Sequence, residues 1–205
     1  GKLESLQYSY NSTTSEILNT KQENIFIPLS EALKPSESIT INLKYQIKLP
    51  DACFTGYGIN TNHILLKYFF LVPETFEDEN KSNSFYRDTE ETANAGSFWK
   101  VNFEIPKYWK IYSNLIQNND FEFEGKSIND PEFQISKEIY PEFSLNIDGQ
   151  NVKVDLGYQT NEYQRQILSS VLTNHLKFIK SRTGNLPEKL FITDKFMKKE
   201  EFIGI

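Results

Sequence analysis

Residues 38–49 alternate between polar and apolar side chains with almost no interruption. Every second residue from Ile39 to Leu49 is apolar, and several of these are β-branched or aromatic. A period of two with this composition predicts a half-buried β-strand whose apolar side chains share one face. Pro50 then ends the strand, because proline has no amide hydrogen to donate to a neighbouring strand.

Shorter apolar runs separated by turn residues recur as far as about residue 157. An Asp148-Gly149 pair stands between the alternating runs 143–147 and 151–156, and it predicts a tight hairpin because both residues tolerate positive φ. Many short strands are typical of a β-sandwich or a barrel, and we expect an antiparallel β-sandwich or a saddle-like pair of sheets. Further strands are expected at residues 6–10, 24–28, 65–72, 98–105, 110–115 and 120–124.

The period changes after residue 160. Apolar residues at spacings of three and four predict one helical stripe over residues 161–182. Thr160 or Asn161 can cap the start of this helix, and Gly184 can end it. A short strand is predicted at 189–193. The stripe consists of Tyr163, Ile167, Leu168, Val171, Leu172, Leu176, Phe178 and Ile179.

A helix of this length spans about 30 Å and has to bury its stripe against something. One arrangement is that the helix and the strand after it open a second, α/β domain. The other is that the helix folds back on the β-domain as a C-terminal cover. The pattern alone leaves both arrangements open.

Composition narrows the function classes. The 205 residues include 16 Phe, 11 Tyr and 2 Trp, which is enough bulky material for a packed core and excludes general disorder. The net charge of −6 argues against a nucleic-acid partner, which needs a basic surface. A single Cys cannot form an internal disulfide, and no apolar run reaches the roughly 18 residues that a membrane-spanning helix needs.

Candidate chemistry is sparse. The two histidines, His63 and His175, are not part of a His-Glu-x-x-His motif, and Cys53 has no second Cys, so we expect no metal site within the chain. Gly56-Tyr57-Gly58 lacks a third glycine and a phosphate-binding Lys, and it predicts a turn. The acidic stretch 74–91 departs from a calcium loop at its sixth and twelfth positions, which favours a solvated loop.

Aromatic residues offer one binding alternative. Trp99 and Trp109, or the run Tyr68-Phe69-Phe70, could line a platform for a sugar. We favour core packing for them, because alternate residues of such a run face the interior of a sheet pair.

Several stretches, in their order along the chain, carry a family resemblance. The strand ending Tyr-Gln-Ile-Lys-Leu-Pro-Asp at 45–51 leads into Phe-Thr-Gly-Tyr-Gly-Ile-Asn-Thr-Asn at 54–62 and then into the aromatic run 66–74. The helix end at 174–179 and the stretch 184–192 follow. This order resembles the N-terminal β-domain of bacterial aminopeptidase N-like (gluzincin) zinc metallopeptidases, followed by the entry into their thermolysin-like domain.

The resemblance implies that the chain is the non-catalytic N-terminal portion of a zinc peptidase, truncated before the zinc-binding His-Glu-x-x-His. It implies domains at 1–157 (β-sandwich) and 158–205 (helix and strand opening the catalytic domain). Gly204 matches the first residue of the exopeptidase motif Gly-x-Met-Glu-Asn and is the one substrate-binding candidate. The stretch 54–62 lacks the Glu with which relatives hold the substrate amino terminus. Zinc, a peptide substrate and the remainder of the catalytic domain are expected of the longer parent.

The alternative functions are a stand-alone β-sandwich module that binds carbohydrate or another ligand, and a structural or interaction protein that has lost catalysis. For the chain itself we expect no catalytic residue, no cofactor, no nucleic acid and no membrane-spanning segment. The compartment is not fixed by the sequence, although a periplasmic or other extracytoplasmic location is preferred to the cytoplasm.

Overall fold

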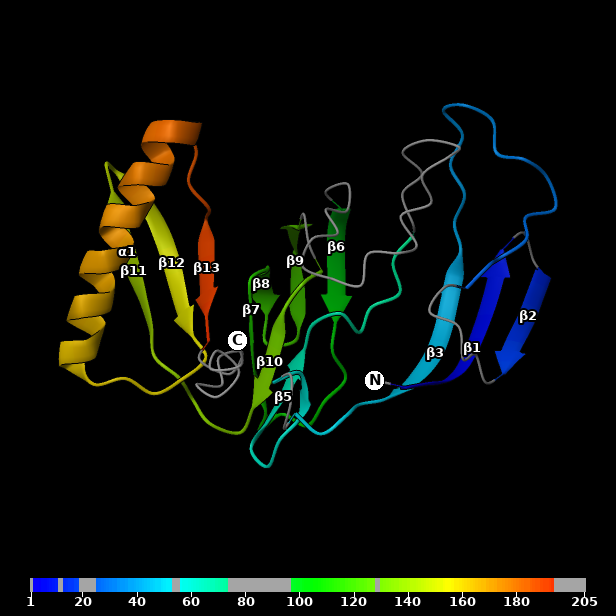
Figure 1. The fold of residues 1–205 in the computed structure, drawn as a ribbon, viewed down its shortest axis with the longest axis horizontal. Coiled ribbons are helices and arrows are strands. Elements are labelled where there is room, and N and C mark those ends of the chain that lie inside the picture. Colours follow the sequence, from blue (N-terminus) through cyan, green and yellow to red (C-terminus); the bar gives the residue numbers. More distant parts are fainter. Residues whose placement is uncertain are drawn as a thin grey trace, which may run out of the picture. The chain divides into compact units, whose positions relative to one another are not determined.

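The computed structural model describes residues 2–10, 13–18, 25–52, 56–73, 97–127 and 130–193. These residues divide into two compact units, the first reaching to Pro50 and the second beginning at Asp51. Figure 1 shows β-strands in both units and one long helix in the second. Each unit is described by itself below.

The first unit contains an antiparallel sheet in the order β2-β1-β3. Its strands are β1 (Lys2–Tyr10), β2 (Thr13–Leu18) and β3 (Asn42–Lys48). Leu6 and Tyr8 of the central strand are buried, and they lie opposite Tyr45 and Leu43 of β3. The alternating pattern of β3 therefore places its apolar residues beside the buried residues of β1, as a half-buried strand should.

Two strand predictions for this unit need correction. The strand predicted at 38–49 begins only at Asn42, which lies opposite Ser9. In this register residues 38–40 extend past Tyr10, the last residue of β1. Residues 25–28, the described part of the strand predicted at 24–28, are not in a strand. Both edges of β1 are already occupied, by β2 and β3. The strand β2 was not predicted.

The second unit contains two antiparallel sheets of orders β4-β5-β10-β7 and β6-β9-β8. The first consists of β4 (Gly58–Ile59), β5 (His63–Leu66), β7 (Lys110–Ser113) and β10 (Phe133–Ser136). The second consists of β6 (Ser97–Asn102), β8 (Ile116–Asn119) and β9 (Glu122–Ser127). The strands predicted at 98–105, 110–115 and 120–124 correspond to β6, β7 and β9 with shifted ends, whereas β4, β8 and β10 were not predicted.

An aromatic core joins these two sheets. Phe123 of β9 and Phe133 of β10 are fully buried, and their ring centroids lie 5.6 Å apart. Phe103 packs edge-on against both, at 4.9 Å from Phe133 and 6.1 Å from Phe123. Edge-to-face contacts of this kind add to the area that the rings bury, so the cluster is a main source of stability for this part of the unit.

The strand predicted at 65–72 ends at Leu66. The chain bends there, and Tyr68 has a φ of 61°, which is a left-handed conformation uncommon for a residue other than glycine. The strand β10 was not predicted for a different reason. Its polar residues Gln134 and Ser136 are as buried as its apolar ones, so the strand shows no alternation.

The C-terminal part of the second unit has a third sheet, in the order β11-β12-β13, and one helix. The elements are β11 (Glu142–Ile147), β12 (Gln150–Leu156), α1 (Glu162–Thr183) and β13 (Lys189–Ile192). The predicted hairpin is confirmed, with φ of 50° at Asp148 and 85° at Gly149. The strand β13 pairs with β12 in parallel, so β12, α1 and β13 form a β-α-β crossover.

The predicted helix is confirmed together with both of its ends. The side chain of Asn161 accepts a hydrogen bond from the backbone N–H of Gln164 (2.8 Å), and the backbone N–H of Asn161 donates to the side chain of Gln164 (3.0 Å). This reciprocal pair is a capping box. Gly184 ends the helix with a φ of 74°, and its N–H donates to the carbonyl of Lys180.

The prediction of a single apolar stripe on the helix is wrong. Leu176 is buried, and Leu168 and Leu172 pack beside it on the sheet. In contrast, Tyr163 and Phe178 are 71% and 60% exposed. With 3.6 residues per turn, residues nine positions apart lie on opposite sides of a helix, so the apolar residues form two faces instead of one.

The fold class is confirmed at the level of a mainly β chain with several antiparallel sheets and one long helix near the C-terminus. Residues on both sides of position 157 share a core, because Val154 and Leu156 of β12 cluster with Leu176 of α1. Among the described residues, no helix is long and apolar enough to cross a membrane.

Candidate functional site

One end of the β4-β5-β10-β7 sheet collects polar and aromatic side chains. Lys67 and Tyr68 follow the end of β5, and Glu132 immediately precedes β10. Since β5 and β10 are antiparallel, these positions meet at the same end of the sheet. Tyr57 precedes β4 and Asn114 follows β7. Both lie at that same end of the sheet, because β4 is antiparallel to β5 and β7 is antiparallel to β10.

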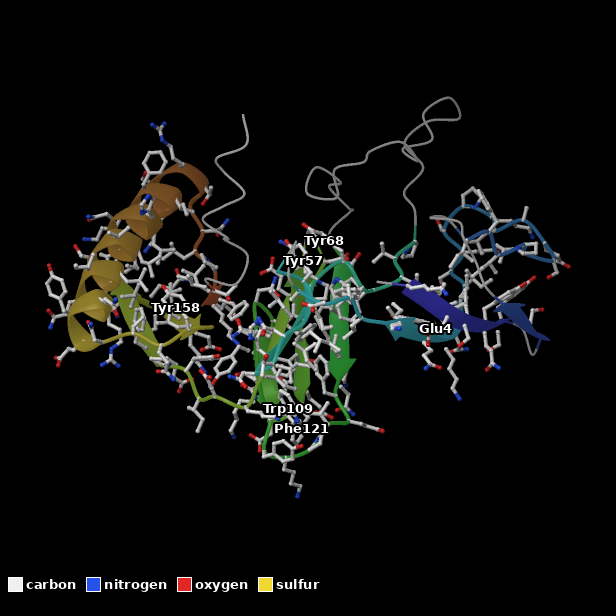
Figure 2. All side chains as sticks on the ribbon, turned by 60° about the horizontal axis from the view of Figure 1, so that its bottom comes forward. Glu4, Tyr57, Tyr68, Trp109, Phe121 and Tyr158 are labelled. Carbon is white, nitrogen blue, oxygen red and sulfur yellow. The ribbon has the colours of Figure 1, made fainter. Side chains whose placement is uncertain are left out.

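Lys67 is the centre of this group. Its Nζ lies 2.5 Å from a carboxylate oxygen of Glu132 and 5.1 Å from the centroid of the Tyr68 ring. The rings of Tyr57 and Tyr68 meet edge to face at 5.5 Å, and Figure 2 shows the two side by side. Partial burial acts to lower the pKa of Lys67, but the hydrogen bond and the charge of Glu132 outweigh it, so the pKa is raised above the ordinary value.

Two further residues complete the group. The side chain of Asn114 accepts a hydrogen bond from the backbone N–H of Glu132 at 3.0 Å and so holds the start of β10. Asp130 is only 7% exposed. Burial raises the pKa of its carboxyl group, and the positive charge of Lys67 offsets part of that rise.

This chemistry suits a structural role better than catalysis. A Lys whose pKa is raised stays protonated at neutral pH, so it is neither a base nor a nucleophile. The ion pair and the cation–π contact instead hold the left-handed turn at Tyr68 in place. We therefore interpret the group as a clasp, formed by Lys67, Glu132 and Tyr68, that fixes the loop after β5.

A second polar group is more deeply buried. Lys189 of β13 donates to a carboxylate oxygen of Asp155 (2.8 Å) and to the carbonyl of Leu115 (3.0 Å). The side chains of Lys189 and Asp155 are only 4% and 5% exposed. Burial lowers the pKa of Lys189, and the hydrogen bond and charge of Asp155 oppose that effect.

A hydrogen-bonded triad lies between the β4-β5-β10-β7 sheet and the β11-β12-β13 sheet. The side chain of Gln134, fully buried, donates to the carbonyl of Gly157 at 2.7 Å and accepts from the hydroxyl of Thr193 at 2.8 Å. Both partners lie beside the strands of the β11-β12-β13 sheet, whereas Gln134 belongs to β10. These bonds therefore orient one sheet against the other, and neither Lys189 nor Gln134 was singled out by the sequence.

The two histidines are not brought together. His63 is buried at the start of β5, whereas His175 lies exposed on α1 with its Nδ1 3.0 Å from the carbonyl oxygen of Val171. Within the described ranges, no group of three or more His, Cys, Asp or Glu side chains could hold a metal ion. Cys53, Gly204 and the acidic stretch 74–91 lie outside the described residues.

The glycine motif at 56–58 and the two tryptophans have the structural roles that the sequence analysis favoured over binding roles. Gly56 and Gly58 have φ of 76° and 121°, in keeping with the predicted turn into β4. Trp99 packs against Phe70 at 5.6 Å, and its buried indole N–H has no hydrogen-bond partner among the described residues. Trp109 packs against the same aromatic core, so core packing is confirmed for both tryptophans.

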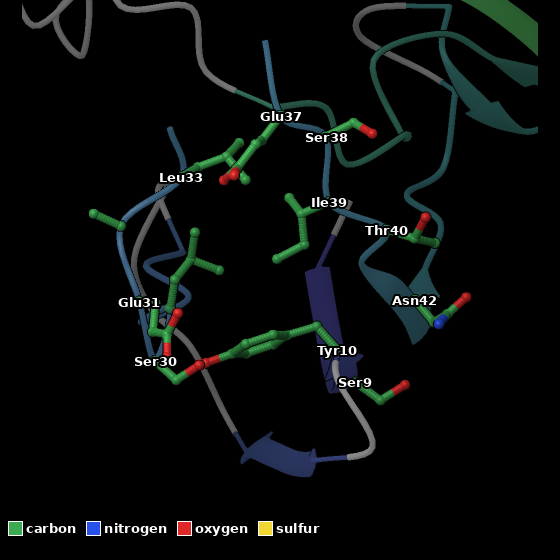
Figure 3. A pocket seen from close by; sticks show the side chains of 12 residues that line it. Ser9, Tyr10, Ser30, Glu31, Leu33, Glu37, Ser38, Ile39, Thr40 and Asn42 are labelled. Atoms are coloured by element: carbon green, nitrogen blue, oxygen red, sulfur yellow. The ribbon is translucent and has the colours of Figure 1, made fainter. Parts of the chain in front are cut away.

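A cavity of about 750 Å³ lies in the first unit, between the end of β1 and the segment 29–42. Figure 3 shows the side chains of Tyr10, Leu33 and Ile39 pointing into it. The Tyr10 hydroxyl donates to the carbonyl of Pro28 at 2.7 Å, which fixes its ring. Hydroxyl, amide and carboxylate groups complete the lining, contributed by Ser9, Ser30, Glu31, Glu37, Ser38, Thr40 and Asn42.

No known protein family matches the chain, and no curated protein is similar to it.

Proposed function

We propose that the chain is the non-catalytic N-terminal portion of a zinc-dependent, aminopeptidase-like peptidase. The β-α-β crossover of β12, α1 and β13 is the observation that best supports this proposal, since it follows the antiparallel β-sheets at the point where the resemblance expects an α/β domain to open. Parallel pairing and a crossover helix are the hallmarks of such domains.

In this proposal the chain up to about residue 157 belongs to a β-sandwich or saddle-like domain that caps the active-site cleft and limits which peptides enter. The core that Val154 and Leu156 share with Leu176 joins the end of this domain to the part that follows. Residues 158–205 are the start of the thermolysin-like domain, and Gly204 begins the exopeptidase motif. The zinc ion and its His-Glu-x-x-His ligands belong to the polypeptide beyond this chain. Zinc would polarise the scissile carbonyl and activate water there.

The clasp has a place in this function. The resemblance puts the stretch 54–62 beneath the catalytic domain, and Tyr57, which belongs to that stretch, packs on Tyr68 of the clasp. A wall of a substrate cleft has to keep its shape when peptides enter and leave. The ion pair of Lys67 with Glu132 would supply that rigidity.

Metal analysis and activity assays of two proteins test the proposal. The 205-residue chain should contain no stoichiometric zinc and should not cleave amino-acid p-nitroanilides. The full-length natural protein should bind one zinc per chain and cleave them. Tight equimolar zinc in the 205-residue chain, or a full-length protein without a His-Glu-x-x-His and without zinc, would overturn the proposal.

The cavity of the first unit favours a second candidate, a ligand- or carbohydrate-binding module. The cavity combines one fixed aromatic ring with hydroxyl, amide and carboxylate groups, which are the groups that can hydrogen-bond to a polar ligand such as a sugar. A glycan array probed with the chain and with Tyr10→Ala tests it. Tyr108→Ala is the matched control, because Tyr108 is 65% exposed and lies in the other unit. Glycan binding that is lost in Tyr10→Ala and kept in Tyr108→Ala supports this candidate. The absence of binding to any glycan on the array counts against it.

A further inference from the structure

Two lysines approach the buried carboxylate of Asp155, each through a different oxygen atom. The Nζ of Lys189 lies 2.8 Å from Oδ2, and the Nζ of Lys153 lies 3.5 Å from Oδ1. The side chains of Lys189 and Asp155 are almost completely buried, whereas that of Lys153 is 44% exposed. One oxygen of the carboxylate therefore faces a lysine that is removed from solvent, and the other faces a lysine that solvent reaches.

The two lysines differ in how readily they become neutral amines. Burial lowers the pKa of Lys189, and the hydrogen bond and charge of Asp155 oppose that effect. The pKa of Lys153 is raised, chiefly by its hydrogen bond to Glu142, whose carboxylate lies 2.8 Å from its Nζ. Only a neutral amine has the free electron pair that a nucleophile needs, and burial is one way in which proteins activate lysine. Lys189 is thus suited to be a nucleophile, and Lys153 remains a cation.

The sheet holds the amine of Lys189 against Asp155. The strands β12 and β13 are parallel neighbours in which Lys189 lies opposite Lys153, and Asp155 is two residues further along β12 on the same face. The Nζ of Lys189 also donates to the backbone carbonyl of Leu115 at 3.0 Å, which fixes the end of a long side chain. Two groups held in contact in this way react without the entropic cost of an encounter.

We propose that Lys189 and Asp155 condense to a side-chain amide, an intramolecular isopeptide bond between β13 and β12. A proton first passes from the Lys189 ammonium to Oδ2 of Asp155, which leaves an amine beside a carboxylic acid. The electron pair of Nζ then forms a bond to Cγ, and one electron pair of the C=O bond moves to Oδ1.

Collapse of this tetrahedral intermediate completes the reaction. The electron pair on Oδ1 forms the carbonyl again, the bond between Cγ and Oδ2 breaks, and a proton from Nζ joins the departing hydroxyl group to give water. One ammonium and one carboxylate thus become one amide and one water molecule, with no external reagent. The product replaces two buried charges by a neutral group, which removes the cost of keeping those charges out of water.

Lys153 has a defined role in this reaction. Oδ1 of Asp155 has no hydrogen-bond partner in the part of the chain that the structure describes, and the Lys153 ammonium lies 3.5 Å from it. Negative charge collects on Oδ1 when the amine attacks Cγ. A cation already in place beside that oxygen stabilises the intermediate, as donors do in an oxyanion hole.

The bond closes a covalent ring that runs from Asp155 in β12 through α1 to Lys189 in β13. Among the described strands, β13 is at the edge of its sheet and pairs only with β12. An edge strand at the end of a crossover can separate from its sheet by local unfolding. The isopeptide bond prevents this separation, and it forms whether or not the chain belongs to a peptidase.

Mass spectrometry of the intact, denatured chain tests the proposal. The wild-type 205-residue chain should be lighter than its sequence mass by one water molecule, and a digest should contain a branched peptide that joins Lys189 to Asp155. Lys189→Arg is the matched control, because arginine keeps the positive charge but does not lose its proton in proteins. This variant should have its full sequence mass.

A wild-type chain at its full sequence mass overturns the proposal, whether or not the control folds. The Asp148-Gly149 turn can also lose one water molecule, by forming a succinimide, so a loss that persists in Lys189→Arg overturns it as well. A branched peptide at Lys153 instead of Lys189 does the same.

The rate of bond formation tests the role of Lys153. Mass spectra taken at intervals after cell-free synthesis should show that Lys153→Met forms the cross-link about 10-fold more slowly than the wild type. An unchanged rate overturns the role of Lys153 in stabilising the intermediate.

Discussion

The Nζ of Lys189 lies 2.8 Å from a carboxylate oxygen of Asp155, and both side chains are almost completely removed from solvent. The two residues belong to β13 and β12, neighbouring strands of one parallel pair. The second carboxylate oxygen of Asp155 lies 3.5 Å from Lys153, and Lys189 also donates to the carbonyl of Leu115. Lys153 also pairs with Glu142 at 2.8 Å, so the group contains two lysines and two carboxylates. The Asp155 oxygen that faces Lys153 has no hydrogen-bond partner among the described residues, so the pair with Lys189 is the main compensation for burying this carboxylate.

Removal of one partner should be costly. We expect Lys189→Met to lower the free energy of unfolding by about 3–5 kcal/mol, because Asp155 is left buried with only the more distant Lys153. Urea unfolding followed by circular dichroism measures the change. Lys153→Met is the matched control, with an expected loss below about 1 kcal/mol, since the Lys153 side chain is 44% exposed.

The double variant Lys189→Met with Asp155→Leu should be more stable than Lys189→Met alone, because it removes the orphaned charge. Equal losses for Lys189→Met and Lys153→Met would contradict the assignment of Lys189 as the key member of the pair.

Gly157 should tolerate no side chain. A Cβ at this position would overlap the side-chain oxygen of Gln134 and come within 2.9 Å of Thr193. We expect Gly157→Ala to destabilise the protein by roughly 1–3 kcal/mol, the usual cost of overpacking. Thermal unfolding followed by circular dichroism measures the loss.

Gly149→Asn is the control for Gly157→Ala. Gly149 has a φ of 85° with no heavy atom near its missing Cβ, and Asn tolerates this conformation. A small effect at Gly149 and a large one at Gly157 would separate close packing from backbone conformation. Similar losses at both positions would show that the contact with Gln134 is not the reason for glycine at 157.

Elements governed by local interactions were predictable from the sequence. The helix from Glu162 to Thr183 and its caps at Asn161 and Gly184 depend on hydrogen bonds within a few residues. The turn at Asp148 and Gly149 likewise depends on two residues that accept positive φ. Local signals of this kind are legible before any tertiary contact is known.

Elements governed by distant partners were not predictable. The strand β10 is buried although it contains the polar residues Gln134 and Ser136, so its sequence does not look like that of a buried strand. The side chain of Gln134 forms its hydrogen bond with Gly157, and that of Ser136 with Tyr140, only in the folded protein. The clasp of Lys67 with Glu132 joins residues that are far apart in the sequence, and no motif marks it. The two apolar faces of α1 merged into one predicted stripe for the same reason, since periodicity alone does not say where the sheet lies.

The helix cap offers a direct test of local stabilisation. Asn161→Ala should cost about 1 kcal/mol, because the N–H of Gln164 loses its acceptor. Gln164→Ala should cost less, and the double variant should lose less than the sum of the two single losses, since both belong to one capping box. Strict additivity in urea unfolding would mean that the two hydrogen bonds act independently.

Asp130, whose carboxyl group interacts with the charge of Lys67 in the clasp, predicts a dependence of stability on pH. Burial raises the pKa of Asp130, so the folded state holds this proton more tightly than the unfolded state does. Between the ordinary carboxyl pKa of about 3.9 and the raised value, the folded protein binds more protons, and stability falls as the pH rises. Above the raised pKa the carboxylate is charged and its burial destabilises the fold, while below about pH 4 the effect is absent.

Asp130→Asn removes this titration. We expect the variant to exceed the wild-type free energy of unfolding by about 1 kcal/mol at pH 7, with the gain shrinking to nothing as the pH falls towards 4. Urea unfolding of both proteins across this range measures the difference, with the exposed Glu138→Gln as control. A gain that is constant with pH would assign the effect to packing of the amide, and a loss at pH 7 would show that the attraction between Asp130 and Lys67 outweighs the cost of burial.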